Sequence, residues 1–382
     1  MPIACQHKVV HGPQFCVSDC PVTAPCGIFD YQRIETPDQL PIADERIIDV
    51  AVLDMNHGWP NLGHDSLVHL VQDAACDTFE ILKSTGLKLR ALSYDVRRSA
   101  MVPQNPNQHL NLYLGTGGPG NIDPKMNDGQ SEASQGILED PSWEGKVFDL
   151  FDAIRENKKA VLLAVCHTFG VMCRWAGIAT PQFRGPEKGG KSTGILENIL
   201  TPEARQHPWF GRFAEALPET GRFRIVDNRL FDLIPNGPLP DGLIAIGYET
   251  PGINGAQAEA LTMVEWRRDQ AGIMPRMFGV NHHPEIMDRA RQLMILERKH
   301  DRHEVSDRWY QERIDILTQS YPEENSELLL ALTSDYTLVA PFRFHLYREI
   351  RLRAEALGHS IPLHENQILE TPRSLCSQPF LS

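Results

Sequence analysis

The chain has 382 residues, 41% of them hydrophobic, so it is long enough to bury a substantial core in one large domain or two. It carries 37 Lys and Arg against 50 Asp and Glu, a formal net charge of −13. That charge disfavours binding to nucleic acid phosphates and to anionic membrane surfaces, so neither is an expected partner. No apolar segment resembles a signal peptide or reaches membrane length, and we therefore expect a cytoplasmic protein.

Residues 1–45 contain several prolines and little periodicity, which predicts an extended, Cys-rich N-terminal arm. The eight cysteines are few for a chain of this length, so a disulfide framework is not expected. Four of them crowd this arm and are candidate ligands for zinc or an iron–sulfur cluster: Cys5, Cys16, Cys20 and Cys26. Their spacing matches no paired Cys-x2-Cys pattern, so thiols that pack or lie exposed are the alternative. No metal or other cofactor is therefore expected.

From residue 46 to 300, apolar runs alternate with amphipathic stretches, as is typical of βα units. We expect an α/β domain with a mostly parallel sheet flanked by helices. The predicted strands are 47–55, 87–96, 111–114, 160–165 and 277–281, with shorter ones near Phe223, Leu243 and Leu261. The predicted helices are 67–82, 143–154 and 168–176. Residues 301–382 are charged and helical, with helices near 309–317 and 342–357, and are expected to form a C-terminal helical extension.

Cys166 directly follows the apolar run 160–165 and precedes the predicted helix 168–176. This strand–turn–helix arrangement lifts a nucleophile above the end of a sheet. The N-terminus of the following helix supplies a positive dipole and free backbone N–H groups, which lower a thiol pKa and stabilise an oxyanion. We therefore predict that Cys166 is a nucleophile. The alternative is a structural cysteine buried at a strand end.

His283 and Glu285 lie in the sequence Asn-His-His-Pro-Glu, immediately after the predicted strand 277–281. Because they are two residues apart, their side chains can point to the same side. His283 would take the thiol proton, and Glu285 would orient the imidazole and stabilise its charged form. A glycine-rich segment, 115–120, follows another strand and offers backbone N–H groups to a developing oxyanion. A surface His-Pro-Glu turn is the alternative interpretation.

The Gly-Gly-Pro-Gly sequence at 117–120, the cysteine elbow and the His-Pro-Glu sequence together resemble the class I glutamine amidotransferase family. The resemblance covers about residues 47–300 and implies a flavodoxin-like fold. It implies hydrolysis of the glutamine side-chain amide, with ammonia released or passed to a separate synthetase chain. By this resemblance Cys166 is the nucleophile, His283 the base and Glu285 its orienting carboxylate, and the oxyanion and substrate-binding positions are Gly117, Gly118 and His167.

The sequence departs from the family pattern at the elbow. Family members usually carry Gly-x-Cys-x-Gly, whereas this chain has Ala-Val-Cys-His-Thr, which places the bulkier Thr168 after the nucleophile. Many members also carry glutamine four residues after the cysteine, where this chain has Gly170. The nucleophile and its base are thus better supported than glutamine as the substrate.

Residues 185–192 fit the phosphate-loop pattern Gly-x4-Gly-Lys-Ser. A phosphate loop needs a buried strand before it and a helix directly after it, and the flanking residues 180–184 and 193–194 predict neither. Nucleotide binding is therefore not expected. His57 and His64 lack the partner spacing of a metal site, His282 is expected to lie behind the reacting groups, and Trp59 and Asn61 either line the pocket or pack.

Three functions remain open on the sequence alone. The first is a glutaminase or amidotransferase-type hydrolase acting on glutamine. The second is a γ-glutamyl peptide hydrolase or acyltransferase using the same three side chains, as suggested by Thr168 and Gly170. The third is a non-catalytic binding or regulatory homologue. In each case the C-terminal helices offer a surface for a second copy of the chain or another protein.

Overall fold

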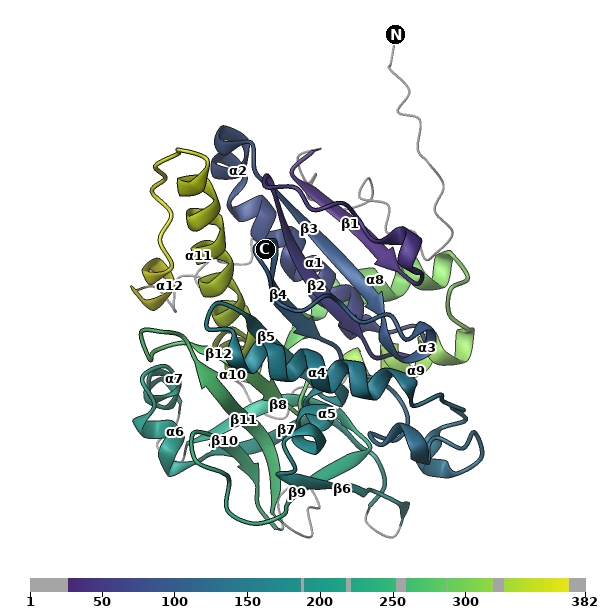
Figure 1. Cartoon of the computed structure of the whole chain (residues 1–382). Coiled ribbons are helices and arrows are strands. Elements are labelled where there is room, and N and C mark those ends of the chain that lie inside the picture. Colours follow the sequence, from purple (N-terminus) through teal and green to yellow (C-terminus); the bar gives the residue numbers. More distant parts are fainter. Residues whose placement is uncertain are drawn as a thin grey trace.

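A ten-stranded sheet forms the centre of the molecule in the computed structural model, which describes residues 27–186, 189–217, 221–251, 259–286, 288–318 and 326–370 (Figure 1). In sheet order the strands are β1 (Phe29–Ile34), β3 (Lys88–Asp95), β2 (Ile47–Asp54), β4 (Leu110–Gly115), β5 (Val161–Val165), β12 (Pro275–Val280), β11 (Ala260–Arg268), β10 (Ile244–Glu249), β7 (Ser192–Leu200) and β8 (Arg222–Arg229). The first six are mutually parallel, and the last four pair antiparallel. The predicted α/β fold with a mostly parallel sheet is confirmed.

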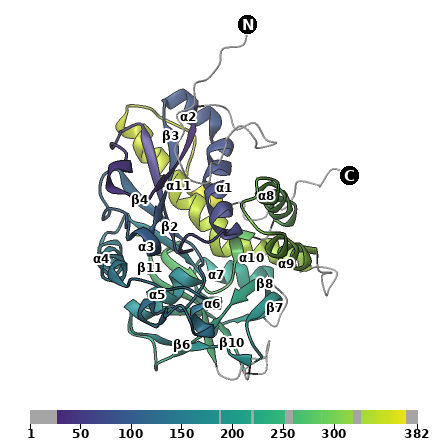
Figure 2. The same cartoon turned by 90° about the vertical axis from the view of Figure 1, so that its right-hand side faces the viewer.

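Helices cover both faces of this sheet (Figures 1 and 2). They are α1 (Leu62–Asp77), α2 (Phe79–Thr85), α3 (Val96–Ser99), α4 (Ser142–Glu156), α5 (His167–Trp175), α6 (Pro202–Gln206), α7 (Phe210–Ala216), α8 (Arg289–Asp301), α9 (Asp307–Thr318), α10 (Ser326–Ser334), α11 (Ala340–Ala356) and α12 (Asn366–Glu370). A π-helix, Asp335–Val339, joins α10 to α11, and short 3-10 turns occupy 37–39, 124–126, 132–134 and 284–286. No helix in the described ranges is long and apolar enough to cross a bilayer.

The alternation of side chains along the strands produces two hydrophobic cores. In β2, Val50 and Val52 face one core, whereas Ala51 and Leu53 face the other. The first core includes residues of α1, α7 and α11, and the second includes residues of α4 and α5. Both faces of the parallel strands are therefore buried, as their continuous apolar sequences require.

The segment expected to be an N-terminal arm contains a strand of the sheet. Phe29–Ile34 is β1, which pairs in parallel with β3 at the edge. Both ends of β1 are buried against the rest of the fold, and this contact with β3 is not visible in local periodicity. The cysteines proposed as metal ligands, Cys5, Cys16, Cys20 and Cys26, lie outside the described residues.

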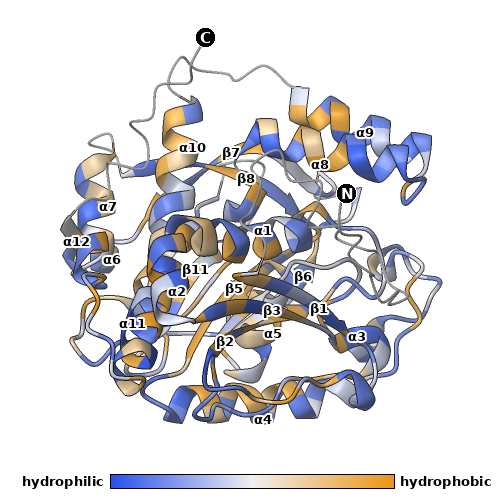
Figure 3. Ribbon diagram, turned by 90° about the horizontal axis from the view of Figure 1, so that it is seen from above, coloured by the Kyte–Doolittle hydropathy of each residue, from blue (hydrophilic) through white to orange (hydrophobic). Residues whose placement is uncertain are grey.

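The C-terminal helices share a core with the sheet. Tyr336, Phe342 and Ile350 belong to the same hydrophobic cluster as β2 and β5. The indole N–H of Trp209 donates to the Tyr336 carbonyl (2.8 Å), and His345 Nε2 contacts the Pro275 carbonyl (2.8 Å). The predicted helices near 309–317 and 342–357 correspond to α9 and α11. Colouring by hydropathy shows both polar and apolar turns on α8 and α9 (Figure 3).

Candidate active site

Cys166 occupies a strained turn between β5 and α5. Its backbone has φ 46° and ψ −100°, a conformation that residues other than glycine rarely adopt. The Cys166 N–H donates to the Val280 carbonyl of the neighbouring strand β12 (2.7 Å), and its carbonyl accepts from Gly170 N–H (2.9 Å). The cysteine itself is partly exposed, whereas β5 and the first residues of α5 are buried. The fold therefore presents a thiol at the carboxyl end of a central strand, as the sequence predicts.

The bulky Thr168 fits at this elbow because its neighbour is a glycine. A Cβ atom added to Gly115 would lie only 2.4 Å from Thr168 Cγ2 and 2.7 Å from its Cβ. Thr168 also fixes the elbow to the next loop, since its hydroxyl and its N–H both contact the Thr116 carbonyl, at 2.7 and 3.2 Å. The departure from the family's glycine at this position is thus compensated by Gly115 at the end of β4.

Gly170 is packed against an apolar side chain. A Cβ atom at this position would lie 2.6 Å from Ile122 Cδ1 and 3.1 Å from two other carbons of the same residue. Ile122 therefore takes the space into which a longer side chain at position 170 would extend. One wall near the elbow is therefore apolar.

His283 and Glu285 form a buried pair after β12. Nδ1 of His283 lies 2.8 Å from Oε1 of Glu285, and the two side chains are 8% and 1% exposed. Burial by itself lowers the pKa of His283, but the negative charges of Glu285 and of a Cys166 thiolate, with their hydrogen bonds, raise it well above its ordinary value. This arrangement favours the charged imidazolium form of His283.

Gly117 marks the point where the candidate nucleophile and base approach the glycine-rich loop. A Cβ atom added there would lie 2.8 Å from His283 Cε1 and 3.4 Å from Cys166 Cβ. Only a glycine leaves room for both side chains. The three segments that the sequence analysis singled out, after β4, β5 and β12, therefore converge within a few ångströms.

The N-terminal end of α1 packs against Glu285. A Cβ atom added to Gly63, in the first turn of α1, would lie 2.4 Å from Oε1 of Glu285. The neighbouring Asn61 caps the helix, because its side-chain oxygen accepts from His64 N–H at 3.0 Å. The positive end of the helix dipole thus lies next to the buried Glu285 side chain.

Two backbone donors beside Cys166 are free to bind an oxyanion. The N–H groups of Gly118 and His167 donate to no other group among the residues that the structure describes, whereas that of Cys166 is used by Val280. The Nε2 atom of His167 is buried and has no hydrogen-bond partner among the described residues. Burial, and then the positive charge of Arg97, hold the pKa of His167 well below its usual range, so its ring is neutral.

A fully buried Arg97–Glu139 pair, which no sequence motif predicts, supports the glycine-rich loop. The guanidinium of Arg97 donates to both carboxylate oxygens of Glu139, at 2.6 and 2.7 Å. It also donates to the Met55 carbonyl (2.9 Å) and to the carbonyl of Pro119 (2.6 Å), the residue after Gly118. A Cβ atom on Gly118 would lie 2.2 Å from the Met55 carbonyl oxygen, so the loop is held tightly against β2.

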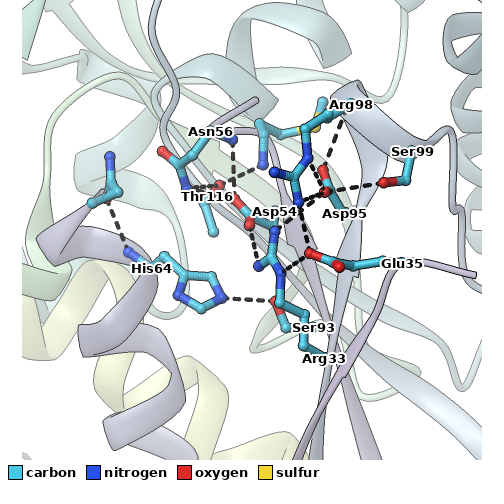
Figure 4. A network of polar contacts seen from close by, with 12 residues as sticks. Arg33, Glu35, Asp54, Asn56, His64, Ser93, Asp95, Arg98, Ser99 and Thr116 are labelled. Atoms are coloured by element: carbon cyan, nitrogen blue, oxygen red, sulfur yellow. Dashed lines mark hydrogen bonds and ion pairs between the residues drawn. The ribbon is translucent and has the colours of Figure 1, made fainter. Parts of the chain in front are cut away.

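A second polar network reaches the same loop from the edge of the sheet (Figure 4). Arg33 of β1 donates to Asp54 at 2.7 Å, and Asp54 accepts from the Asn56 side chain at 2.6 Å. The Asn56 amide lies 3.4 Å from the Thr116 hydroxyl, which donates to the Gly117 carbonyl at 2.7 Å. Strand β1 therefore contributes to the position of the loop, although it lies far from Cys166 in sheet order.

The remaining residues named from the sequence have mainly structural surroundings. His64 contacts Asp65 (3.1 Å) and Ser93 (2.7 Å), and Trp59 is 45% exposed. His282 is buried behind His283, and burial followed by the charges of His283 and Arg229 lowers its pKa to about 3. Among the described residues no group of His, Cys, Asp and Glu is arranged to hold a metal.

The segment 185–192 is not a phosphate loop. A short strand does precede it, β6 (Ala179–Phe183), contrary to the sequence-based expectation, and it pairs antiparallel with β9 (Phe231–Pro235) in a separate two-stranded sheet. An edge position tolerates its Pro181. Strand β7 rather than a helix begins at Ser192, so the helix N-terminus that would hold a phosphate is missing there.

Comparison with known proteins gives matches only among solved structures. No family model and no curated protein matches the sequence. A glutamine amido transferase from Methylobacillus flagellatus aligns with 80% of this chain and 95% of its own, with 10% identity and a TM-score of 0.41. The glutaminase domain of Trypanosoma brucei CTPS, solved with bound acivicin, aligns with 63% of this chain and 86% of its own, with 9% identity and a TM-score of 0.35.

Proposed function

We propose that this protein is a cysteine-dependent amidohydrolase of the glutamine amidotransferase type, which hydrolyses the side-chain amide of glutamine or a related γ-glutamyl amide. The observation that carries the proposal is the convergence of the Cys166 elbow, the 2.8 Å His283–Glu285 contact and two free backbone donors. Each of these groups has a defined role in acyl transfer through a thioester.

In the proposed reaction the Cys166 thiolate attacks the amide carbon while the N–H groups of Gly118 and His167 bind the oxyanion. The C–N bond then breaks, and His283 gives its proton to the departing nitrogen, which leaves as ammonia. A water molecule attacks the resulting thioester and transfers a proton to His283, and cleavage of the C–S bond releases the acid. Glu285 holds the imidazole in the required orientation throughout.

The second candidate is hydrolysis or acyl transfer on γ-glutamyl peptides. The packing of Ile122 against Gly170 favours it, because the polar side chain that the resemblance associates with glutamine binding is absent at position 170 and Ile122 lies in the adjacent space. Both candidates use the same nucleophile and base and differ in the group attached to the γ-glutamyl nitrogen. A separate synthetase chain as acceptor of ammonia belongs to the first candidate only.

The test is ammonia and glutamate release from glutamine, and product release from γ-glutamyl peptides, by wild-type protein, Cys166→Ala and the matched control Cys76→Ala. Cys76 is also partly exposed but lies in α1. We expect Cys166→Ala to abolish release and Cys76→Ala to retain it. A glutamine-like electrophile should label Cys166 in the same preparation, as checked by mass mapping.

Three outcomes separate the candidates. Release from glutamine supports the glutaminase, and release from γ-glutamyl peptides alone supports the second candidate. If Cys166 were no more reactive than Cys76 and neither substrate were cleaved, the hydrolase would be excluded in favour of a non-catalytic binding protein.

A pH profile tests the role of Glu285. Because the Glu285 charge raises the pKa of His283, Glu285→Gln should lower that pKa. The alkaline limit of kcat/KM, where the imidazolium loses its proton, should then move to lower pH, and kcat should fall about 10- to 100-fold. An unchanged alkaline limit would contradict the role given to Glu285.

A further inference from the structure

The C-terminal extension is hydrogen-bonded to the turn that carries the candidate base. This 3-10 turn, Pro284–Ile286, directly follows His283 and contains Glu285. The hydroxyl of Ser334, the last residue of α10, donates to the Pro284 carbonyl at 2.7 Å. Because Pro284 lies between His283 and Glu285, this hydrogen bond acts on the backbone that joins their two side chains.

The residue next to Ser334 docks the extension on the adjacent strand. The hydroxyl of Thr333, which is fully buried, donates to the Arg224 carbonyl of β8 at 2.7 Å. Strand β8 also accepts the His283 N–H, and α10 packs along it (Figures 2 and 3). Two consecutive residues therefore bind both segments that hold His283, which are β8 and the 284–286 turn.

A π-helix fixes the position of Ser334. It spans Asp335–Val339, begins directly after Ser334 and packs against the same turn. Pro341 has no N–H to donate to the carbonyl five residues earlier, which is that of Tyr336. The indole N–H of Trp209 donates to this carbonyl instead, at 2.8 Å. A buried side chain thus satisfies the irregular backbone, and π-helices of about one turn are frequent at functional sites.

We propose that Ser334 is a positioning residue for the candidate active site, whose hydroxyl holds the turn carrying His283 and Glu285 in its reactive arrangement through the Pro284 carbonyl. This inference rests on the proposed function and adds a residue of the C-terminal extension to the groups on which that function depends. Ser334 acts through the backbone and not on the reacting atoms. A change in how the extension docks would therefore alter the base without altering Cys166.

The titration of His283 reports on the geometry of this turn. Burial lowers the pKa of His283, and the negative charges of Glu285 and of a Cys166 thiolate raise it. The neighbouring His282, whose pKa is lowered to about 3, adds no charge at neutral pH. If the 2.8 Å contact of His283 with Glu285 loosens, the stabilisation of the imidazolium weakens and the pKa of His283 falls.

The experiment compares Ser334→Ala with Ser334→Thr, which keeps the hydroxyl, and with Thr337→Val in the full chain. Thr337 is the matched control, because its hydroxyl donates to the Thr333 carbonyl (2.6 Å) and this bond stays within the extension. The titration of His283 is followed by NMR of protein with isotope-labelled histidines, and His283→Asn identifies its signal. The kcat and KM are measured on whichever substrate of the proposed function is hydrolysed, and thermal unfolding checks that each variant is folded.

In Ser334→Ala, His283 should titrate at a lower pH than in the wild type, and kcat should fall about 10-fold with KM nearly unchanged. Ser334→Thr and Thr337→Val should match the wild type in both respects. An unchanged His283 titration in the folded Ser334→Ala protein, or an equal shift in Thr337→Val, would overturn the positioning role even if glutamine were hydrolysed. A lower His283 titration in Ser334→Ala, when the wild type hydrolyses neither substrate, would support the positioning role and reject the proposed function.

Discussion

The two sides of Cys166 differ in how completely their buried polar groups are satisfied. On the side of the glycine-rich loop, the side chains of Arg97, Glu139 and Asn127 bond to one another and to backbone carbonyls. Buried atoms without a partner on that side are fewer, and include Asn56 Oδ1 and His167 Nε2. On the side of His283, buried polar atoms of Asn198 and His282 have no hydrogen-bond partner among the described residues. The same is true of Thr262, Asn281 and Asp335 on that side.

This difference indicates two kinds of structural support. A fully bonded network holds backbone atoms in one arrangement, as the proposed oxyanion donors would require. Buried polar groups that lack protein partners are normally met by ordered water, which leaves their surroundings more adaptable. The loop side therefore holds the proposed oxyanion donors in place, whereas the histidine side has buried polar atoms that lack a partner among the described residues.

The largest expected effect concerns the bonded network of Arg97, Glu139 and Asn127. Arg97→Met should destabilise the protein by about 3–5 kcal/mol, because Glu139 would be left buried without its cation. Urea unfolding measures this. The neighbouring Arg98 is 47% exposed and pairs with Asp95, so Arg98→Met should cost less than about 1 kcal/mol. Equal losses for the two variants would remove the distinction between the networks.

The elbow packing provides a second test of the same side. Gly115→Ala should destabilise by about 1–3 kcal/mol, because the new Cβ would lie 2.4 Å from Thr168 Cγ2. In the Gly115→Ala/Thr168→Gly double variant the clash is absent, so the two effects should be strongly non-additive. Additive changes in a double-mutant cycle would show that the two residues do not compensate each other.

The sequence predicted the parts of this site that are local. Cys166 was found because a strand, a turn and a helix follow one another, and His283 with Glu285 because two residues along a strand end share a side. Arg97 and Glu139 are 42 residues apart, and neither lies in a motif. Such a pair forms only when distant loops pack together, and hydrophobic periodicity along the chain does not predict that packing. The same holds for the contact of Thr168 with Gly115 and for the edge strand β1.

On the histidine side, Asp335 links stability to pH. Burial, partly offset by Arg343, raises its pKa from 3.8 to about 7. A carboxyl with a raised pKa in the folded chain stabilises fully below about pH 4, and this contribution is lost as the pH rises through about 7. Asp335→Asn should therefore stabilise the protein above pH 7 by on the order of 1 kcal/mol, with no gain in acid. Thermal melts below pH 4 and above pH 7 measure this. An equal effect of Asp335→Asn at both pH values would contradict the raised pKa of Asp335.

The smallest effect is expected at Asn198. Because its side-chain oxygen and nitrogen have no partner among the described residues, Asn198→Val should change stability by no more than about 1 kcal/mol. Asn127 bonds to Glu139 and to the Asn121 backbone, so Asn127→Val should cost about 1–3 kcal/mol. A larger loss at Asn198 than at Asn127 would reverse the comparison of the two sides.

The positive φ of Cys166 strains the backbone at the residue that carries the proposed nucleophilic thiol. Holding a side chain in such a conformation costs about 1–3 kcal/mol, which the hydrogen bonds to Val280 and Gly170 must offset. Glycine would relieve this strain and remove the thiol in the same step. A Cys166→Gly protein would then melt at a higher temperature than the wild type while lacking the proposed nucleophile, so under the proposed function a gain in thermal tolerance at this position would accompany a loss of activity.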